Sequence, residues 1–295
     1  MVTALTWVML HTLRPEAWAL DERATLVQFG DYLQRVFLHG DFGLSWEPFG
    51  AGRPVGDFLR AQVGHDLWLL GGGLLLGLAG GIAGGALCAA QAGTLPARAI
   101  ETLASVLLCT PPYVMGLSLL LLFGAGIETI DIGIGIPTNH VEMSESLSGW
   151  LGSMIAPWIV LALPWGAFVL RMMRGSMAEV LQEEYLRTAR AKGLRERVVL
   201  RRHATPAALA PVFSLAGASI PLLVTNMVLV ESVFSIPGVF QDLNEQVNDG
   251  NFPVIQGITV VAAALVAATA LIADIALARL DPVVRQLRGG RSRPV

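Results

Sequence analysis

Five long runs of apolar residues constrain this chain more than any other feature. They cover residues 67–90, 102–123, 150–170, 207–230 and 252–278. The first four contain no charged residue, and the fifth contains one, Asp274. An apolar run of about 20 residues is long enough to cross a bilayer as an α-helix. The runs therefore predict an all-α, polytopic membrane protein with five full spans.

The composition excludes a soluble enzyme. Only 15% of the residues are charged and the mean hydropathy is +0.60, whereas a soluble domain carries about 25% charged residues. The only lysine, Lys192, follows Ala-Arg-Ala, so the sequence has no GxxxxGKS/T phosphate loop and ATP hydrolysis is not expected. We expect no cofactor, no metal site and no nucleic-acid partner. Cys88 and Cys109 lie in apolar runs without metal-ligand spacing and are predicted to be buried free thiols.

The loops differ sharply in charge. Residues 171–206 carry nine Lys or Arg against four Glu, and residues 279–295 carry five Arg. The loops 124–149 and 231–251 contain acids and no basic residue. Basic loops stay in the cytoplasm, so the first pair is predicted to face inside and the second pair outside. The short 91–101 loop then faces inside, 14–62 faces outside, and the C-terminus is cytoplasmic.

Alternation also requires that whatever precedes residue 13 begins in the cytoplasm, so a complete chain would have six spans with both ends inside. Residues 1–13 are apolar, too short to cross, and have no signal-peptide features. We interpret them as a short or truncated first span, whose start is missing or mis-assigned, or as a short variant of that span.

Small residues and prolines mark two places within the apolar runs. Glycines recur at every fourth residue of the first run: Gly73, Gly77, Gly81 and Gly85. Such a stripe lets another helix approach closely. We interpret it first as helix packing within this chain and second as a subunit interface. Pro111 and Pro112 are predicted to break or kink the third span near mid-membrane. That kink either lines a pathway or is a packing feature. Asp274 and Asn226 are interpreted first as structural and second as functional.

The segment 185–206, YLRTARAKGLRERVVLRRHATP, is a dense basic stretch between two apolar runs. Ser176 and Glu179 fit a capping box, which predicts a fresh helix starting there. Glu183 and Arg187 stand four apart in the favourable order for an ion pair. Gly193 is predicted to end the helix in the left-handed conformation. The result is a polar helix–Gly–helix unit suited to docking a cytoplasmic protein. Loop charge alone would favour a basic loop that merely obeys topology or binds anionic lipid, and the spacing of the Gly, His and Pro residues favours docking.

This segment resembles the "EAA" cytoplasmic loop of type I ABC-importer permeases, and most closely the B-type subunit of the dipeptide/oligopeptide/nickel permease family. Further segments agree with that family in order and side: HGDFGLSW (39–46), TPPYVMG (110–116), RMMRGSMAEVL (171–181), ESVFSIPGVFQ (231–241), NFPVIQG (251–257) and LDPVVR (280–285). The resemblance covers residues 14–285. It departs at the missing first span and at Thr188-Ala189-Arg190, which replaces the "EAA" letters in a spelling usual for this subfamily.

The resemblance implies a domain plan: 1–13 as the remnant of a first span, 14–62 as an extracytoplasmic region, 63–281 as the type-1 transmembrane domain, and 282–295 as a basic tail. Within it, 171–206 would be the coupling loop that seats in a groove on the ATPase. The implied coupling residues are Tyr185, Arg187, Thr188, Ala189, Arg190, Ala191, Lys192, Gly193, His203 and Pro206.

The implied function is that of a permease subunit in a bacterial inner membrane, forming half of a pathway for di- or oligopeptides or a similar solute. Its implied partners are a related second permease in a heterodimer, two ABC ATPase subunits, an extracytoplasmic binding protein and the lipid bilayer. Outer-loop acids such as Glu231 and Asp242 would be available to the binding protein. The alternative is a non-transporting membrane scaffold that docks a cytoplasmic protein. A proton-coupled transporter would need buried carboxylates along the spans, and Asp274 alone does not supply them.

Overall fold

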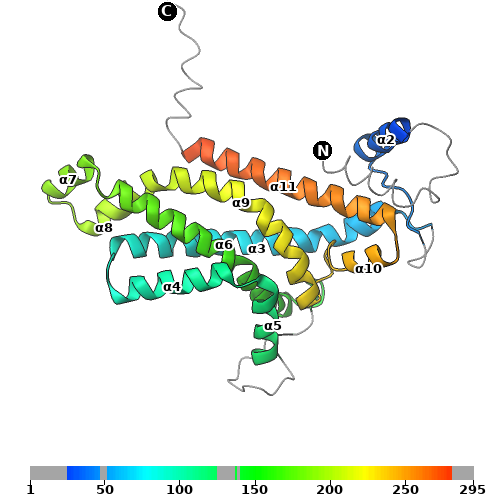
Figure 1. The fold of residues 1–295 in the computed structure, drawn as a ribbon, viewed down its shortest axis with the longest axis horizontal. Helices are drawn as coiled ribbons and strands as arrows, with labels where there is room; N and C mark the ends of the chain where they lie inside the picture. Colours follow the sequence, from blue (N-terminus) through cyan, green and yellow to red (C-terminus); the bar gives the residue numbers. More distant parts are fainter. Residues whose placement is uncertain (1–24, 47–51, 125–136, 138–139, 281–295) are drawn as a thin grey trace, which may run out of the picture.

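The computed structural model describes residues 25–46, 52–124, 137 and 140–280, and this part of the chain is almost entirely helical (Figure 1). One isolated β-bridge, Leu44 to Pro54, lies outside the helices. The helices are α2 (Thr25–Gln34), η2 (Arg35–His39), α3 (Val55–Ala90), α4 (Leu95–Cys109), α5 (Pro112–Phe123), α6 (Leu147–Val180), α7 (Glu184–Ala191), α8 (Glu196–Val198), η3 (Val199–Ala204), α9 (Thr205–Phe234), α10 (Leu243–Asn248) and α11 (Phe252–Leu280). The predicted first span and the basic tail lie outside the described residues.

In the described residues, the long apolar helices lie on the apolar runs of the sequence. Four helical stretches are long and apolar enough to cross a membrane: α3, α6, α11 and residues 196–234, which include α9. The pair α4 and α5 supplies a fifth crossing if it counts as one broken span. α3, α6 and the stretch 196–234 are 36, 34 and 39 residues long, and each exceeds the about 20 residues that a bilayer requires.

α3 and α6 pack closely because glycines face one another. A Cβ on Gly81 would lie 2.7 Å from both the Gly166 carbonyl oxygen and the Val169 Cβ, and a Cβ on Gly77 would lie 2.7 Å from the Trp165 ring. Gly73 is crowded by the Leu161 side chain of α6, and Gly85 by the Leu170 carbonyl oxygen and Met173 of α6. All four glycines of the stripe are buried. The structure thus places the stripe against α6 of the same chain, where backbone-to-backbone approach replaces side-chain packing.

The third apolar run is broken at its proline pair. α4 ends at Cys109, α5 begins at Pro112, and the two helices are bent by 105°. Pro111 has extended backbone angles, as the residue before a proline prefers. Cys109, predicted to be buried, is exposed at this break, because the bend turns it away from the neighbouring helices; Cys88 is buried and donates weakly to the Ala97 carbonyl.

The helices run back and forth, so the connecting segments gather at two ends. Residues 91–101 and 171–206 form one, called here the basic end; residues 140–146 and 231–251 form the other, called the acidic end. In Figure 1, α7 and α8 lie at one extreme of the molecule and α10 lies near the other. Loops that are predicted to face the same side of the membrane therefore lie at the same end of the molecule. Asp274 is exposed on α11, toward the basic end.

At the acidic end, two segments far apart in sequence bind each other. The Trp46 amide donates to Asn251 Oδ1 at 3.1 Å, and Asn251 Nδ2 donates back to the Trp46 carbonyl at 3.3 Å. The Trp46 ring meets Phe252 edge-on. Tyr32 and Val36 of α2–η2 are buried against Phe42 and Val260. Residues 25–46 therefore form a folded cover over the start of α11.

One local prediction fails here, and one expected boundary falls within a helix. α6 does not restart at the capping box: it runs unbroken through Ser176 to Val180, because Met173 and Met177 are buried in the core and Ser176 Oγ donates to the Ala208 carbonyl of α9. α3 begins at Val55, well before the apolar run at residue 67, so the expected boundary at residue 62 falls inside a helix. Val55 and Leu59 are buried, which gives this polar-looking first part of α3 its own core contacts.

Candidate functional site

Residues 184–206, called here the α7 unit, lie at the basic end, and α7 is the short helix that begins the unit. Leu186 is fully buried, in the same core as Met177 of α6 and Val199 and Ala204 of η3. A turn connects it to α6, with the Glu183 amide donating to the Val180 carbonyl at 3.0 Å. Burying one leucine on an otherwise polar eight-residue helix fixes which face points to the molecule and which points away.

The end of α7 is fixed by a glycine-dependent cap. The Gly193 amide donates to the Arg190 carbonyl at 2.9 Å, and the Leu194 amide donates to the Ala189 carbonyl at 3.4 Å. This pair of bonds is a Schellman motif, with Gly193 at φ +80° in its left-handed position. Residues with a side chain enter that conformation at a cost of about 1–2 kcal/mol, so the turn has a physical reason for glycine.

Across this turn, Arg190 forms an ion pair with Glu196. Arg190 Nη2 lies 2.9 Å from Glu196 Oε1, and Arg190 Nε lies 3.1 Å from Oε2, a two-point contact between α7 and α8. Within the described part of this loop, Arg190 therefore makes the ion pair, in place of the expected Glu183–Arg187 pair. A forked contact of this kind holds the angle between two elements better than a single bond.

The predicted coupling residues divide into two faces. Ala189, Arg190 and His203 are half-buried, and Ala189 packs on the chain's own core. The others are exposed and form the outer face of the unit: Tyr185, Arg187, Thr188, Ala191, Lys192, Gly193 and Pro206. Burial and the nearby Glu183 carboxylate raise the pKa of Tyr185, so its hydroxyl keeps its proton and is available to donate. The outer face combines the Tyr185 hydroxyl and the positive charges of Arg187 and Lys192 with small residues.

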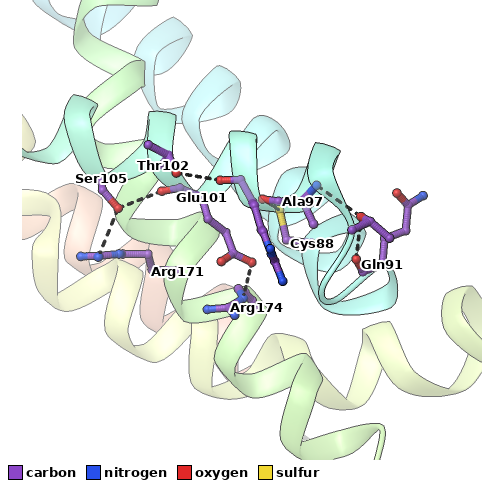
Figure 2. A network of polar contacts seen from close by, with 10 residues as sticks. Cys88, Gln91, Ala97, Glu101, Thr102, Ser105, Arg171 and Arg174 are labelled. Atoms are coloured by element: carbon purple, nitrogen blue, oxygen red, sulfur yellow. Dashed lines mark hydrogen bonds and ion pairs between the residues drawn. The ribbon is translucent and has the colours of Figure 1, made fainter.

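Polar contacts brace the base of this unit, as Figure 2 shows. Arg174 Nε of α6 lies 2.7 Å from Glu101 Oε1 of α4, and Arg171 Nη2 donates to Ser105 Oγ at 3.4 Å (Figure 2). Sequence reasoning treated these arginines only as topology signals, because nothing local links them to Glu101. The contacts join α4 to the end of α6 from which α7 departs.

Glu231, expected to be available to a binding protein, is instead fully buried, so that expectation is wrong for this residue. Its Oε2 accepts from the Phe240 amide at 3.0 Å, while Asp66 Oδ2 accepts from the Val239 amide at 3.1 Å. These two amides are neighbours in the chain, so the two carboxyl groups lie close to each other. Asp66, which lies on α3 before the apolar run, had no signal in the sequence. Together they hold the turn after α9 onto the molecule, where Asp242 remains half-exposed.

Comparisons with known proteins agree with this arrangement. Residues 81–286 match the family model described as "Binding-protein-dependent transport system inner membrane component". A putative peptide permease protein of Brucella ovis is 31% identical over 282 residues, covering 96% of this chain and 86% of the relative. The oligopeptide transport system permease protein OppB of Mycobacterium bovis is 32% identical over 272 residues, covering 90% and 82%. AppB of Bacillus subtilis, which carries the same description, is 32% identical over 257 residues, covering 86% and 80%.

A solved structure described as an amino acid ABC transporter with histidines has a similar fold. It has a TM-score of 0.54 at 16% identity, over 76% of this chain and 94% of that chain. At this identity the likeness concerns the fold alone. The family match covers more than half of the chain, and its extent includes α4 to α11, with the broken α4–α5 pair and the α7 unit. The chain therefore belongs to the binding-protein-dependent transport system inner membrane components, the multi-pass permease subunits of ABC importers.

Proposed function

We propose that this chain is one permease subunit of an ATP-driven importer for di- or oligopeptides or a similar small solute. It forms half of the translocation pathway, and a related second permease in a heterodimer forms the other half. The names of the Brucella, Mycobacterium and Bacillus relatives support a peptide solute. The bend between α4 and α5, with Pro111 and Pro112 at its centre, supports a pathway element, because broken helices line such pathways in transporters.

The observation that carries the proposal is the α7 unit. It is a short helix whose outer face presents Arg187 and Lys192, which make no ion pair within the described chain. Its inner face is fixed by Leu186 and the Arg190–Glu196 contact. A rigid, exposed element on a mobile assembly is what a coupling helix requires. Two separate ABC ATPase subunits hydrolyse the ATP, and the groove of one of them receives this outer face. Closure of the ATPases moves α7, and α6 and α4 follow through the Arg174–Glu101 contact.

The remaining partners follow from the two ends. The basic end and the C-terminus face the cytoplasm of a bacterial cell, in accord with the charge bias of the loops. The acidic end faces outside, where the extracytoplasmic binding protein delivers the solute. Transport then alternates between outward-open and inward-open states, whose populations the ATPases shift.

A matched pair of glycine substitutions tests the coupling role. Gly193 and Gly93 both lie at the basic end with positive φ, +80° and +86°, and a Cβ on either meets nothing within 4 Å. Gly193→Val and Gly93→Val therefore impose the same backbone strain, but only the first lies in the α7 unit. We expect Gly193→Val to reduce both ATPase co-purification and peptide uptake by reconstituted transporter at least about tenfold, the effect of about 1.4 kcal/mol. Gly93→Val should retain both.

Equal behaviour of the two variants would refute the coupling assignment. If the wild-type complex, assembled with its ATPases and binding protein, moved no solute at all, the chain would be a membrane scaffold instead.

A further inference from the structure

Two histidines and a glutamate converge at the acidic end, away from the α7 unit. His65 lies on α3, and His140 and Glu142 lie on the segment that leads into α6. His65 Nε2 is 3.4 Å from Glu142 Oε1 and 3.5 Å from Oε2, and the two imidazole rings meet edge-on with centroids 5.3 Å apart. One donor atom from each residue can be chosen so that all three lie within 4.8 Å of one another.

The segment carrying His140 and Glu142 is fixed in place. Between them, the Val141 amide donates to Ser153 Oγ at 3.4 Å, and Ser153 is itself buried on α6 and donates to the Trp150 carbonyl. Four residues on, Ser146 caps α6 by accepting from the Gly149 amide. Val141 lies against Gly149 of α6, while His140 and Glu142 on either side of it both reach His65.

The imidazoles have nitrogen atoms that the protein leaves unsatisfied. His65 Nδ1 and both ring nitrogens of His140 are buried and have no hydrogen-bond partner in the described chain. Leaving such a group without a partner costs about 1–3 kcal/mol, so native structures rarely do so. Glu142, in contrast, is half-exposed, which gives an ion a route from solvent.

We propose that His65, His140 and Glu142 bind a divalent zinc-like ion at the acidic end of this permease. Two neutral imidazoles and one carboxylate form a donor set that Zn²⁺ accepts, and a water molecule completes four-coordination. Side-chain movement of about 1 Å brings the donor atoms to the separation that tetrahedral Zn²⁺ requires. The ion joins the outer part of α3 to the segment before α6, and Asp66, the next residue on α3, holds the turn after α9. Sequence reasoning expected no metal, because His65 and His140 stand far apart along the chain.

Metal binding by the intact transporter tests the site. The complex, purified without a polyhistidine tag and treated with chelator, is titrated with Zn²⁺ alone and then with Co²⁺, whose visible absorption reports the ligand set. The wild type should bind one Zn²⁺ more than His65→Gln/His140→Gln. His39→Gln is the matched control, because His39 is exposed on η2 and outside the cluster, and it should bind as the wild type does.

Glu142→Gln keeps both imidazoles and the shape of the segment. It therefore tests the site even if the double histidine variant does not fold. We expect it to weaken Zn²⁺ binding by at least about 10–100-fold, the range seen when even an outer-shell partner is lost, and to change the Co²⁺ spectrum. The proposal is overturned if the wild type and the double variant bind equal amounts of Zn²⁺, or if Glu142→Gln binds with wild-type affinity.

Discussion

At the scale of single residues, the pair Asp66–Glu231 is the least expected feature of this permease. Both side chains are fully buried, and each uses one oxygen to accept from a backbone amide of the turn after α9. The other oxygen of each, Asp66 Oδ1 and Glu231 Oε1, is buried without a further donor. Two buried carboxyl groups this close repel each other when both are ionised, so a proton on one of them stabilises the pair. The pair therefore acts as a shared acceptor site onto which residues 239 and 240 are folded.

Two substitutions of Glu231 distinguish the contribution of its hydrogen bonds from that of its charge. Glu231→Gln keeps an acceptor for the Phe240 amide and supplies a donor to Asp66, so the thermal unfolding midpoint of the purified complex should stay close to the wild type. Glu231→Leu leaves the amide and the Asp66 oxygen without partners, at about 1–3 kcal/mol for each buried group. Its midpoint should fall clearly. A glutamine variant as unstable as the leucine variant would show that a charged Glu231, rather than a shared proton, holds the turn.

At the scale of elements, the contact between α3 and α6 decides how closely the helices assemble. Gly81 and Gly80 are neighbours on α3 that differ in what surrounds them. A Cβ on Gly81 would lie 2.7 Å from the Gly166 carbonyl oxygen, whereas a Cβ on Gly80 meets nothing within 4 Å. The first position is a backbone contact and the second is an exposed helix surface.

This difference gives a matched prediction. Gly81→Ala must push α3 and α6 apart, because the added Cβ would lie too close to a backbone oxygen, and such overpacking costs about 1–3 kcal/mol. Gly80→Ala adds the same methyl group without a clash and gains helix propensity, so stability should be unchanged or slightly raised. Thermal unfolding of both variants in the same detergent is the measurement. Equal midpoints would mean that the glycine stripe does not set the α3–α6 distance.

The elements also show what the sequence could and could not predict. Hydropathy located the long helices, the proline pair located the α4–α5 break, and a lone glycine predicted the left-handed end of α7, because each is a local signal. Local signals failed where distant contacts decide. The capping box at Ser176 does not begin a helix, because burial of Met173 and Met177 keeps α6 continuous. The start of α3 at Val55 was not predicted, because its first residues include polar ones. Asp66 and Glu231, or His65 and His140, meet only once the helices are packed.

At the scale of the whole molecule, the helices run back and forth, so the proposed functional features lie at two opposite ends. The α7 unit, with its cap and its Arg190–Glu196 contact, lies at the basic end. The carboxyl pair and the His65, His140 and Glu142 cluster lie where α3 begins and α9 ends. Helices that cross the whole distance, α3 and α6 above all, are the elements through which a change at one end can reach the other.

Orientation in the membrane is the last prediction, and it applies to every helix at once. In a variant with Cys88→Ser and Cys109→Ser, single cysteines are placed at Gln91, exposed in the turn between α3 and α4, and at Val247, 54% exposed on α10. The positive-inside bias requires a membrane-impermeant maleimide to label Val247→Cys in intact spheroplasts and Gln91→Cys only in inside-out vesicles. Because the two residues lie at opposite ends of α3 and α11, neither result can change without the other. A reversed pattern would place α7 outside the cell, away from any ATPase, and the proposed coupling would be impossible.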